Sequence, residues 1–459
     1  MTLPEVSVSF DCGDDSLQRL WEEAERRAKG NLRQVDDDLV LVEGGGYEKI
    51  WLETQPMGGE MYAARSMEAA VNNSLLFMRH QRADGRLPGS IQCAGGRVEP
   101  QFNKLQGFCF AHPALNLYYL MGRDVLWLER LEDCLHRFDE YLWRARERDG
   151  CLSSFCAYDT GEDNALRYGD APGWWEEEAP PEGYAVVPMM SMDVTSYSYA
   201  CREVLAEISR IRGDGREAFW RERAEEVRRA LREKLWDERR GACFDRDKHG
   251  NMVDVLCHNT LRCMHWGSLS QDMADRFVKE HLTNAGEFFT PMPLPSVAVS
   301  DPAFRNNPGN DWSGQPQGLT YQRAIRALEN YGYDGLVNVF GKRLFRAVID
   351  GGYVFPQQFD PFTGQPSPGP SDYGPTILAV LAYVERLWGV HLEMGEVWFS
   401  MSGGMPYACE RRWGDRVYRV ESDGKRARAT ANGQELYDGP CGLRLMTDEA
   451  GRPRRTQTI

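Results

Sequence analysis

The sequence has no run of about 18 apolar residues and no charged start followed by an apolar stretch within residues 1–11. Because a membrane span or an export signal needs such a run, we expect neither, and we expect a cytoplasmic protein. Positive charge is also scarce, since 54 lysines and arginines face 69 aspartates and glutamates, which gives a net charge of −15. That field repels polyanions, so we expect no nucleic acid and no anionic membrane as partner, and a neutral or cationic small molecule is favoured.

Patterns for metal ligands and disulfides are missing as well. The twelve cysteines stand at irregular spacings without a C-x-x-C pair, and the eight histidines form no H-E-x-x-H motif. We therefore expect reduced, mostly buried thiols, no cofactor and no catalytic metal. The acidic run Asp36–Asp38 leaves a structural calcium ion open, although solvated surface is the commoner interpretation of such a run.

What the chain does contain is a long series of helical patterns. Its 459 residues are 42% hydrophobic, which is ample for a large core. Apolar residues recur at helical spacing in Trp220, Ala224, Val227 and Leu231, with arginine and glutamate between them. Eleven blocks of this kind predict helices at about 14–29, 58–81, 107–121, 124–146, 191–212, 214–236, 254–266, 270–283, 314–331, 334–350 and 372–388.

Two kinds of connection join these predicted helices. Short turns such as Gly122-Arg123 alternate with long loops that are rich in glycine, proline and tryptophan. A closed ring of helical hairpins gives this alternation and gathers its long loops on one face, where loops of such length are usually functional. The long loops lie at about 30–57, 82–106, 147–190, 284–313 and 351–371.

The pattern changes near the C-terminal end. Short β-type runs appear at Val397–Ser400 and Val417–Val420, and Asn432-Gly433 is a hairpin turn signal. We therefore predict two parts, a helical catalytic domain of residues 1–394 and a small β-rich tail of residues 395–459.

The segment YDTGEDNALRYG places Asp163 beside Asn164 and is followed by further polar and aromatic residues, Arg167, Trp174 and Trp175. A general acid for glycosidic cleavage needs a carboxyl whose pKa is raised by apolar neighbours and nearby carboxylates, and this loop offers both. An Asp-Asn pair in a loop is also a common turn or helix cap. The residues alone leave both interpretations open.

Aromatic residues with polar neighbours mark further loops. Tyr47, Trp51 and Glu53 suit stacking against sugar faces and hydrogen bonding to hydroxyls. The alternative is that Trp51 belongs to the core and that Glu60 and Glu68 lie on a solvated helix face, which we prefer for Glu68. Across the loops, the predicted substrate-binding residues are Tyr47, Trp51, Glu53, Gln81, Asp84, Asn164, Arg167, Trp174, Trp175, Trp312 and Gln317.

Together with Phe355–Pro366, these motifs resemble the inverting six-hairpin barrel glycosidases, in particular the group of mannosylglycerate hydrolase and processing α-glucosidase I and, more distantly, trehalase. The similarity spans about Val42–Gly389. It implies an all-α fold, an (α/α)6 barrel with a small β-rich C-terminal appendage. It also implies cleavage of an α-linked glucosyl or mannosyl bond with inversion, without a metal or other cofactor.

The resemblance assigns roles to particular residues. The family's glycine-x-Asp-Asn-Ser-Pro-Arg signature matches Gly161–Arg167, which implies that Asp163 is the general acid, although the serine and proline are replaced. Trp51-Leu52-Glu53 is similar to the family's tryptophan-plus-acid loop. Trp312–Gln317 resembles its tryptophan-Arg-Gly-Pro loop, with Ser313 in place of the arginine.

The last motif of the family carries a glutamate that acts as general base. The segment QQFDP that begins at Gln357 occupies the same frame, so the base position falls on a glutamine, which cannot remove a proton from water. Three explanations stay open: a glutamate-to-glutamine variant that holds substrate without turnover, phosphate as the nucleophile, or another carboxylate as base. An inverting hydrolase needs about 6.5–9.5 Å between its two carboxyl groups. The candidate carboxylates are Asp360, Glu53, Glu60 and Asp311.

A glycoside hydrolase acting on a small carbohydrate is the favoured function. One alternative is a degenerate sugar-binding barrel that keeps Asp163 only for hydrogen bonding. Another is a sugar epimerase, which depends on paired histidines such as His258 and His265 and would be indifferent to mutation of Asp163. The sugar, its linkage and the oligomeric state stay open, and the loop Trp174–Val187 is a candidate wall or lid.

Overall fold

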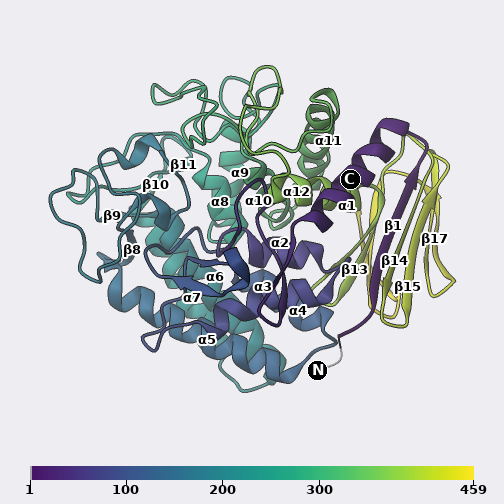
Figure 1. Cartoon of the computed structure of the whole chain (residues 1–459), viewed down its shortest axis with the longest axis horizontal. Coiled ribbons are helices and arrows are strands. Elements are labelled where there is room, and N and C mark those ends of the chain that lie inside the picture. Colours follow the sequence, from purple (N-terminus) through teal and green to yellow (C-terminus); the bar gives the residue numbers. More distant parts are fainter. Residues whose placement is uncertain (1–2) are drawn as a thin grey trace.

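A computed structural model describes residues 3–459. Helices form the larger body of the molecule, and the strands of the C-terminal region form a stack of sheets at one end of it (Figure 1). One large hydrophobic core runs through both parts and includes side chains such as Leu381 in a helix and Phe399 in a strand. Within the described residues, no helix combines the length and the apolar character that crossing a membrane requires.

Residues 3–459 contain twelve α-helices, which confirms the predicted helical blocks and divides one of them. The block at 58–81 is two helices, because the first ends at Tyr62 and the second is capped by Ser66, whose side chain accepts from the N–H of Ala69. The helices are α1 (Asp15–Gly30), α2 (Gln55–Tyr62), α3 (Met67–Arg79), α4 (Ala111–Leu120), α5 (Val125–Ala145), α6 (Met192–Arg212), α7 (Glu217–Lys234), α8 (Asn259–Trp266), α9 (Gln271–Phe277), α10 (Gly318–Glu329), α11 (Asp334–Asp350) and α12 (Gly374–Trp388).

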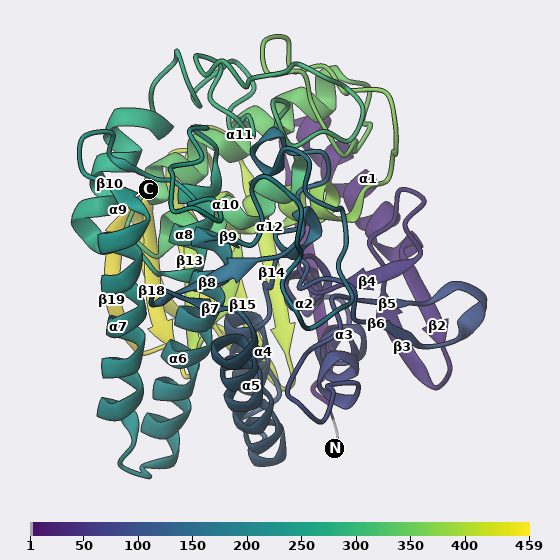
Figure 2. The same ribbon diagram turned by 90° about the vertical axis from the view of Figure 1, so that its left-hand side faces the viewer.

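The helices alternate between inner and outer positions. Each of α2, α4, α6, α8, α10 and α12 contacts the next, and α12 also contacts α2. Every side chain of α8 and α12 is buried, whereas α7 buries only the predicted stripe of Trp220, Ala224, Val227 and Leu231. Figure 2 shows neighbouring inner and outer helices, α4 to α7, packed side by side. The inner helices α8 and α12 are therefore buried on all sides, whereas the outer helix α7 is buried on one face.

The β-rich part is two antiparallel sheets packed against each other. The five-stranded sheet has the order β1-β14-β15-β16-β17, and the four-stranded sheet, β12-β13-β18-β19, contacts α4 and α12. The strands are β1 (Val6–Cys12), β12 (Val390–Glu393), β13 (Glu396–Met401), β14 (Tyr407–Trp413), β15 (Arg416–Ser422), β16 (Arg426–Ala431), β17 (Gln434–Pro440), β18 (Leu443–Asp448) and β19 (Pro453–Thr458).

The β-rich part contains residues outside the segment 395–459 that the sequence predicts. The strands begin at Val390, directly after α12, and the sheet also takes β1 from the other end of the chain, with Val6 opposite Trp413. The predicted runs at 397–400 and 417–420 lie within β13 and β15. A strand so far from its partner leaves no local turn signal in the sequence.

Short strands and helical turns stiffen the long loops and the remaining connections. The strands β4, β5 and β6 form one small sheet and β7, β8 and β9 another, while β2 pairs with β3 and β10 with β11. Their bounds are β2 (Leu32–Val35), β3 (Asp38–Leu41), β4 (Lys49–Trp51), β5 (Ser90–Gln92), β6 (Glu99–Gln101), β7 (Glu147–Arg148), β8 (Cys151–Ser154), β9 (Met189–Met190), β10 (Trp236–Asp237) and β11 (Ala242–Cys243), with short helical turns η1 (Ala94–Gly96), η2 (Ala157–Asp159), η3 (Leu166–Tyr168) and η4 (Val278–Leu282).

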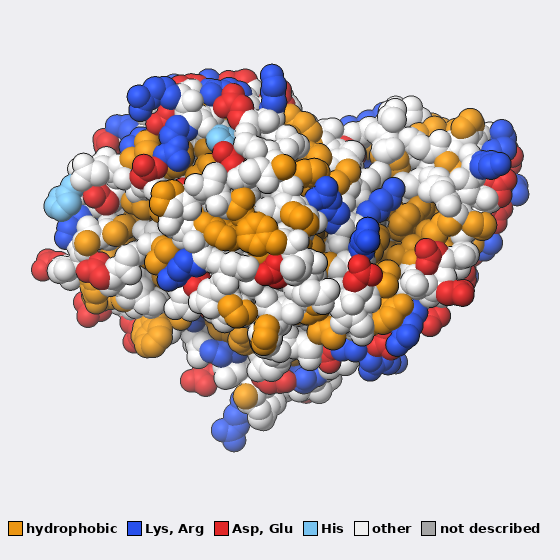
Figure 3. Space-filling model, turned by 90° about the horizontal axis from the view of Figure 1, so that it is seen from above, with side chains coloured by type: hydrophobic (Ala, Val, Ile, Leu, Met, Phe, Trp, Pro, Cys, Tyr) orange, Lys and Arg blue, Asp and Glu red, His pale blue; other side chains and the backbone are white. Residues whose placement is uncertain are grey.

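The surface carries both signs of charge despite the negative total. Seen from above, lysine and arginine side chains lie among aspartates and glutamates around the rim, and hydrophobic side chains gather toward the middle of that face (Figure 3). Ion pairs such as Arg216 with Glu132 and Arg27 with Asp372 contribute to this mixture. Exposed pairs of this kind are worth little individually, so we assign them no stabilising role.

Candidate active site

All five of the predicted long loops meet at one cavity of about 340 Å³. It has the size of a site for a small ligand and combines aromatic walls with a few polar groups. Its lining residues are Glu43, Tyr47, Lys49, Trp51, Glu53, Gln101, Asn103, Lys104, Gln106, Tyr158, Gly161, Asp163, Trp174, Asn310, Trp312, Gln357 and Tyr373.

Asp163 lies on the loop between η2 and η3 and lines this cavity. Its Oδ2 accepts a hydrogen bond of 2.9 Å from Nδ2 of Asn310, and its backbone carbonyl accepts from the N–H of Trp312 at 3.3 Å. Burial and then the charge of Glu53 raise the pKa of Asp163 to about 7. A carboxyl that holds its proton near neutral pH is suited to general acid catalysis.

Glu53 lies beneath the loop that carries Asp163. Its carboxylate accepts from Arg323 at 2.9 Å and from Nε2 of Gln106 at 2.8 Å. Gly161 has φ +76°, and a Cβ there would lie 2.1 Å from Oε2 of Glu53, so only glycine lets the loop approach this closely. The close approach places a negative charge near Asp163.

Gln357 lies on the opposite side of Asn310 from Asp163. The Oε1 of Gln357 accepts from the Tyr47 hydroxyl at 3.0 Å, and its Nε2 donates to Oδ1 of Asn310 at 2.8 Å. One asparagine side chain therefore bridges the two residues predicted at the catalytic positions. The amide of Gln357 carries no charge and acts here as a donor and an acceptor.

Glu43 is a carboxylate of the cavity that the sequence interpretation missed. It follows β3, is 5% exposed, and its Oε1 accepts from the Tyr373 hydroxyl at 3.0 Å. Burial and then the charge of Glu53 raise the pKa of Glu43 well above its usual range. The available signal was a lone glutamate directly before the glycine run Gly44–Gly46, at the end of an apolar stretch.

A pair of lysines forms a basic wall beside Trp51. The Nζ atoms of Lys49 and Lys104 lie 5.0 and 5.2 Å from the centre of its ring. Their hydrogen bonds go to amide oxygens, from Lys49 to Gln101 at 2.9 Å and from Lys104 to Asn103 at 2.8 Å. Burial and then the charge of Lys49 lower the pKa of Lys104 to about 8. The cavity thus has acidic groups on one side and basic groups on another.

The structure brings together seven of the residues predicted from the sequence and places the others around the cavity. The seven that line it are Tyr47, Trp51, Glu53, Asp163, Trp174, Trp312 and Gln357. Gln81 donates to the backbone carbonyls of Gly85 and Cys134, and Asp84 is paired with Arg82. These two side chains hold their loop together.

The remaining predicted contacts have structural partners near the acid loop. Arg167 is buried and pairs with Glu162 and Asp245, and Nε2 of Gln317 is directed at the carbonyl of Asp311. The other two, Asn164 and Trp175, donate to the backbone carbonyls of Asn310 and Ala179 respectively. Contact of these residues with substrate stays a prediction.

Most of the carboxylates considered as replacement bases lie away from this cavity. Asp311 is buried against Arg305 at 2.9 Å, and Asp360 accepts from Asn306 at 2.7 Å and from the backbone of its own turn. Glu53 lines the cavity but is ion-paired with Arg323. The fourth candidate, Glu60, belongs to a second cavity.

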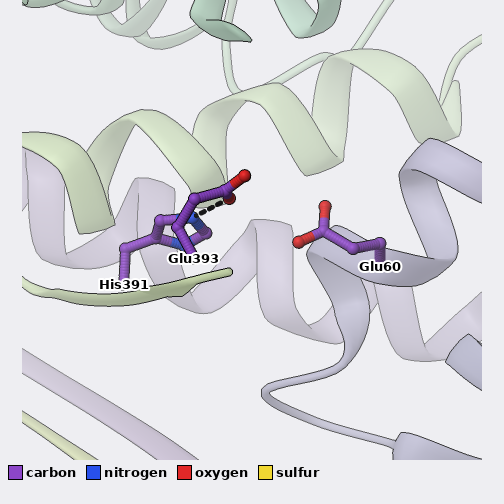
Figure 4. A group of neighbouring side chains, drawn as sticks. All are labelled: Glu60, His391 and Glu393. Carbon is purple, nitrogen blue, oxygen red and sulfur yellow. Dashed lines mark hydrogen bonds and ion pairs between the residues drawn. The ribbon is translucent and has the colours of Figure 1, made fainter. Parts of the chain in front are cut away.

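The second cavity, of about 450 Å³, lies where the helices meet the four-stranded sheet. Glu60 from α2 and His391 and Glu393 from β12 point toward one another there, and their ligand atoms lie within 4.8 Å (Figure 4). Arg326 lies 3.0 Å from Glu393, and Arg386 contacts the His391 ring at 2.9 Å. Because these cations already occupy the space around the carboxylate and the ring, the cluster fits a charge network better than a metal site.

The histidines considered for an epimerase are buried outside the first cavity. His258 contacts Oε1 of Glu162 at 3.0 Å, and His265 contacts the carbonyl of Arg323 at 3.3 Å. Burial lowers the pKa of both rings. They do not form a pair across a ligand cavity, so the arrangement gives an epimerase no support.

Residues 62–374 match the family model described as mannosylglycerate hydrolase MGH1-like glycoside hydrolase domain. Among solved structures, the GH63 mannosylglycerate hydrolase from Thermus thermophilus in complex with glucose is 19% identical with a TM-score of 0.63, covering 79% of this chain and 99% of that chain. Neutral trehalase Nth1 from Saccharomyces cerevisiae is 13% identical with a TM-score of 0.59, covering 79% of this chain and 80% of that chain.

A third similar structure covers a larger share of this chain. The α-L-rhamnosidase from Dictyoglumus thermophilum is 12% identical with a TM-score of 0.61, covering 93% of this chain and 44% of that chain. No curated protein matches the sequence. At these identities, the likeness to solved structures concerns the fold.

Proposed function

Because the chain belongs to the family of mannosylglycerate hydrolase MGH1-like glycoside hydrolase domains, and so is a glycosidase, we propose that it cleaves an α-linked bond with inversion. The proposed substrate is a small oligosaccharide or glycoside, which suits a cavity of about 340 Å³. We further infer that the helices form an (α/α)6 barrel, since α12 contacts α2 after six successive inner helices.

The observation that carries this proposal is the environment of Asp163. Its carboxyl lines an aromatic cavity, has a neutral hydrogen-bonding partner in Asn310, and has a pKa of about 7. In the proposed reaction, Asp163 gives its proton to the glycosidic oxygen as the bond to the anomeric carbon breaks. The buried carboxylate of Glu53, held by Arg323, keeps that proton on Asp163 until the transfer.

The basic wall favours a substrate that carries an anionic group. Lys49 and Lys104 flank Trp51 with amide partners, so a carboxylate or another anion would give them their first opposite charge within this wall. The net charge of the whole chain had suggested a neutral or cationic ligand, but a local pair of lysines acts at shorter range. A mannosylglycerate hydrolase is among the similar structures, and its name implies a glycoside with a carboxylate.

The test is a panel of α- and β-linked glucosides, mannosides and rhamnosides, each with a neutral or a carboxylated aglycone. We expect the chain to cleave an α-linked member and to release the β-anomer first, as followed by proton NMR. Release of the α-anomer from an α-glycoside would contradict inversion. A strict requirement for phosphate, with a sugar phosphate as product, would contradict hydrolysis.

A further inference from the structure

A second carboxylate lies on the side of the cavity where the glutamine stands. We propose that Glu43, and not residue 357, is the general base that removes a proton from the attacking water. This inference rests on the proposed function above and names the residue that completes its reaction.

Tyrosine contacts place Glu43 beside Gln357. The Tyr373 hydroxyl donates to Glu43 at 3.0 Å, and the ring of Tyr373 meets the ring of Tyr47 edge-on with centres 6.3 Å apart. The hydroxyl of Tyr47 in turn donates to Gln357 at 3.0 Å. Asp163 is on the far side of Asn310, so the acid and Glu43 belong to different walls.

The carboxylate of Glu43 has an oxygen available for water. Within residues 3–459, the side-chain hydrogen bond that Glu43 accepts is the one from Tyr373, and it goes to Oε1. The indole N–H of Trp51 is buried and makes no hydrogen bond of good geometry, but it lies close enough to the Glu43 carboxylate to lower the pKa of Glu43 slightly. A water bound there would find an acceptor in Glu43 and a donor in Trp51.

The backbone fixes Glu43 in this position. Its N–H donates to the carbonyl of Lys49 at 3.1 Å, and its carbonyl accepts from Gly374 at 2.7 Å. A Cβ on Gly374 would lie 2.3 Å from that carbonyl oxygen, so the start of α12 approaches Glu43 as closely as a glycine permits. Because both backbone groups of Glu43 are hydrogen-bonded, its side chain starts from a fixed position, as a catalytic base requires.

No other carboxylate combines these features in the described part of the chain. Glu53 shares the cavity but is ion-paired with Arg323, and Asp163 has the acid's role. Burial and then the charge of Glu53 raise the pKa of Glu43, so Glu43 acts as base in the fraction of molecules in which it has lost its proton while Asp163 keeps its own. Asp311, Asp360 and Glu60 lie outside the cavity, as described above.

The proposed step balances without a further reactant. The water oxygen bonds to the anomeric carbon, the glycosidic C–O bond breaks, and the Asp163 proton passes to the leaving oxygen. The water proton passes to Oε2 of Glu43. The products are the inverted sugar and the free alcohol, and one proton then returns from Glu43 to Asp163 through solvent.

The experiment uses the best substrate of the panel and the matching α-glycosyl fluoride, whose leaving group needs little protonation. We expect Glu43→Gln to lower kcat on both substrates by about 10²–10⁴-fold with KM changed only a few-fold. Asp163→Asn should spare the fluoride. The control is Glu48→Gln in the same loop, because that carboxylate pairs with Arg33 and does not line the cavity.

A second experiment tells a missing base from a misfolded variant by restoring the turnover of Glu43→Gln. Azide needs no deprotonation, so it should restore turnover of Glu43→Gln and give the glycosyl azide of inverted configuration. Adding Gln357→Glu to Glu43→Gln should also restore part of kcat, because it supplies a carboxylate to the same wall. Either rescue shows that the variant is folded and lacks a base.

Two results overturn the inference. One is a Glu43→Gln variant that hydrolyses the fluoride at the unmodified rate. The other is an unmodified chain that is inactive while Gln357→Glu alone is active, which leaves the glycosidase function intact and removes Glu43 from it. If neither form cleaves any glycoside, the proposed function itself fails.

Discussion

The side of the cavity with the proposed acid, Asp163, and the side with the proposed base, Glu43, are assembled differently. Asp163 is carried by one continuous loop, which Gly161 tightens against Glu53, and Asn310 from a distant loop donates to its carboxylate. The base side is assembled from separate parts of the chain, since Glu43 and Tyr373 are 330 positions apart and still share a hydrogen bond. The acid side therefore depends on local loop geometry, whereas the base side depends on how the start of α12 meets the end of β3.

The largest expected effect comes from removing the acid. Asp163→Asn keeps the shape of the side chain and deletes its proton, so kcat should fall by about 10²–10⁴-fold on glycosides with poor leaving groups. Steady-state kinetics on aryl glycosides of graded leaving-group pKa measure this loss. Asp84→Asn is the matched control, because Asp84 is paired with Arg82 outside the cavity, and an equal loss there would contradict the assignment.

A second prediction concerns the glycine that tightens the acid side. Gly161→Ala forces a Cβ against Glu53 at a positive φ, so we expect the free energy of unfolding to fall by about 2–4 kcal/mol and activity to fall with it. Denaturant titration with a parallel rate assay measures both.

The control for this glycine is Gly183→Ala. Gly183 also has a positive φ, +86°, but a Cβ there meets no atom within 4 Å. The free energy of unfolding of Gly183→Ala should fall by only about 1 kcal/mol, from backbone strain. Equal losses at the two positions would show that contact with Glu53 is unimportant.

The charge of Glu53 gives a pH prediction. In the proposed mechanism Asp163 acts while it is protonated, and its pKa is about 7, so activity should decline as the pH rises through about 7. Glu53→Gln removes the negative charge that raises this pKa, and the decline should then move to lower pH. A pH profile of kcat/KM, with each variant scaled to its own maximum, measures the shift. Glu176→Gln, which is exposed, should leave the profile in place.

The smallest expected effect lies on the basic wall. Lys104→Met keeps most of the contact with Trp51 and removes the charge, so kcat/KM for carboxylated substrates should fall about tenfold, or about 1.4 kcal/mol. Neutral substrates should be nearly unaffected. Competition between neutral and carboxylated glycosides measures the ratio, with the exposed Lys342→Met as control. An equal loss for both substrate types would assign Lys104 to packing alone.

The sequence predicted the helices and loops well because those signals are local. The stripe of Trp220 and Val227 lies on one face of a helix, and the resemblance of Gly161–Arg167 to a family signature singled out Asp163, which lines the cavity. Glu43, Tyr373 and Asn310 were missed, because each reaches the cavity through contacts that join distant segments.

Two residues that were predicted to bind substrate contact their own loop instead, and the sequence could not show this. Gln81 and Asp84 lie in a loop that looks suited to a ligand, yet their polar groups are engaged by the loop's own backbone and by Arg82. A polar side chain in a turn has two competing uses, and only the fold decides between them.

The pairing of β1 with β14 bears on how this protein is made. A ribosome releases Val6–Cys12 early, but the partner strand, Tyr407–Trp413, emerges only after nearly all of the helices. Throughout that interval, the first strand has an unsatisfied edge that another strand can pair with. The growing chain thus carries β1 without its partner while the helical body packs, and misassociation at this strand is possible until β14 is made.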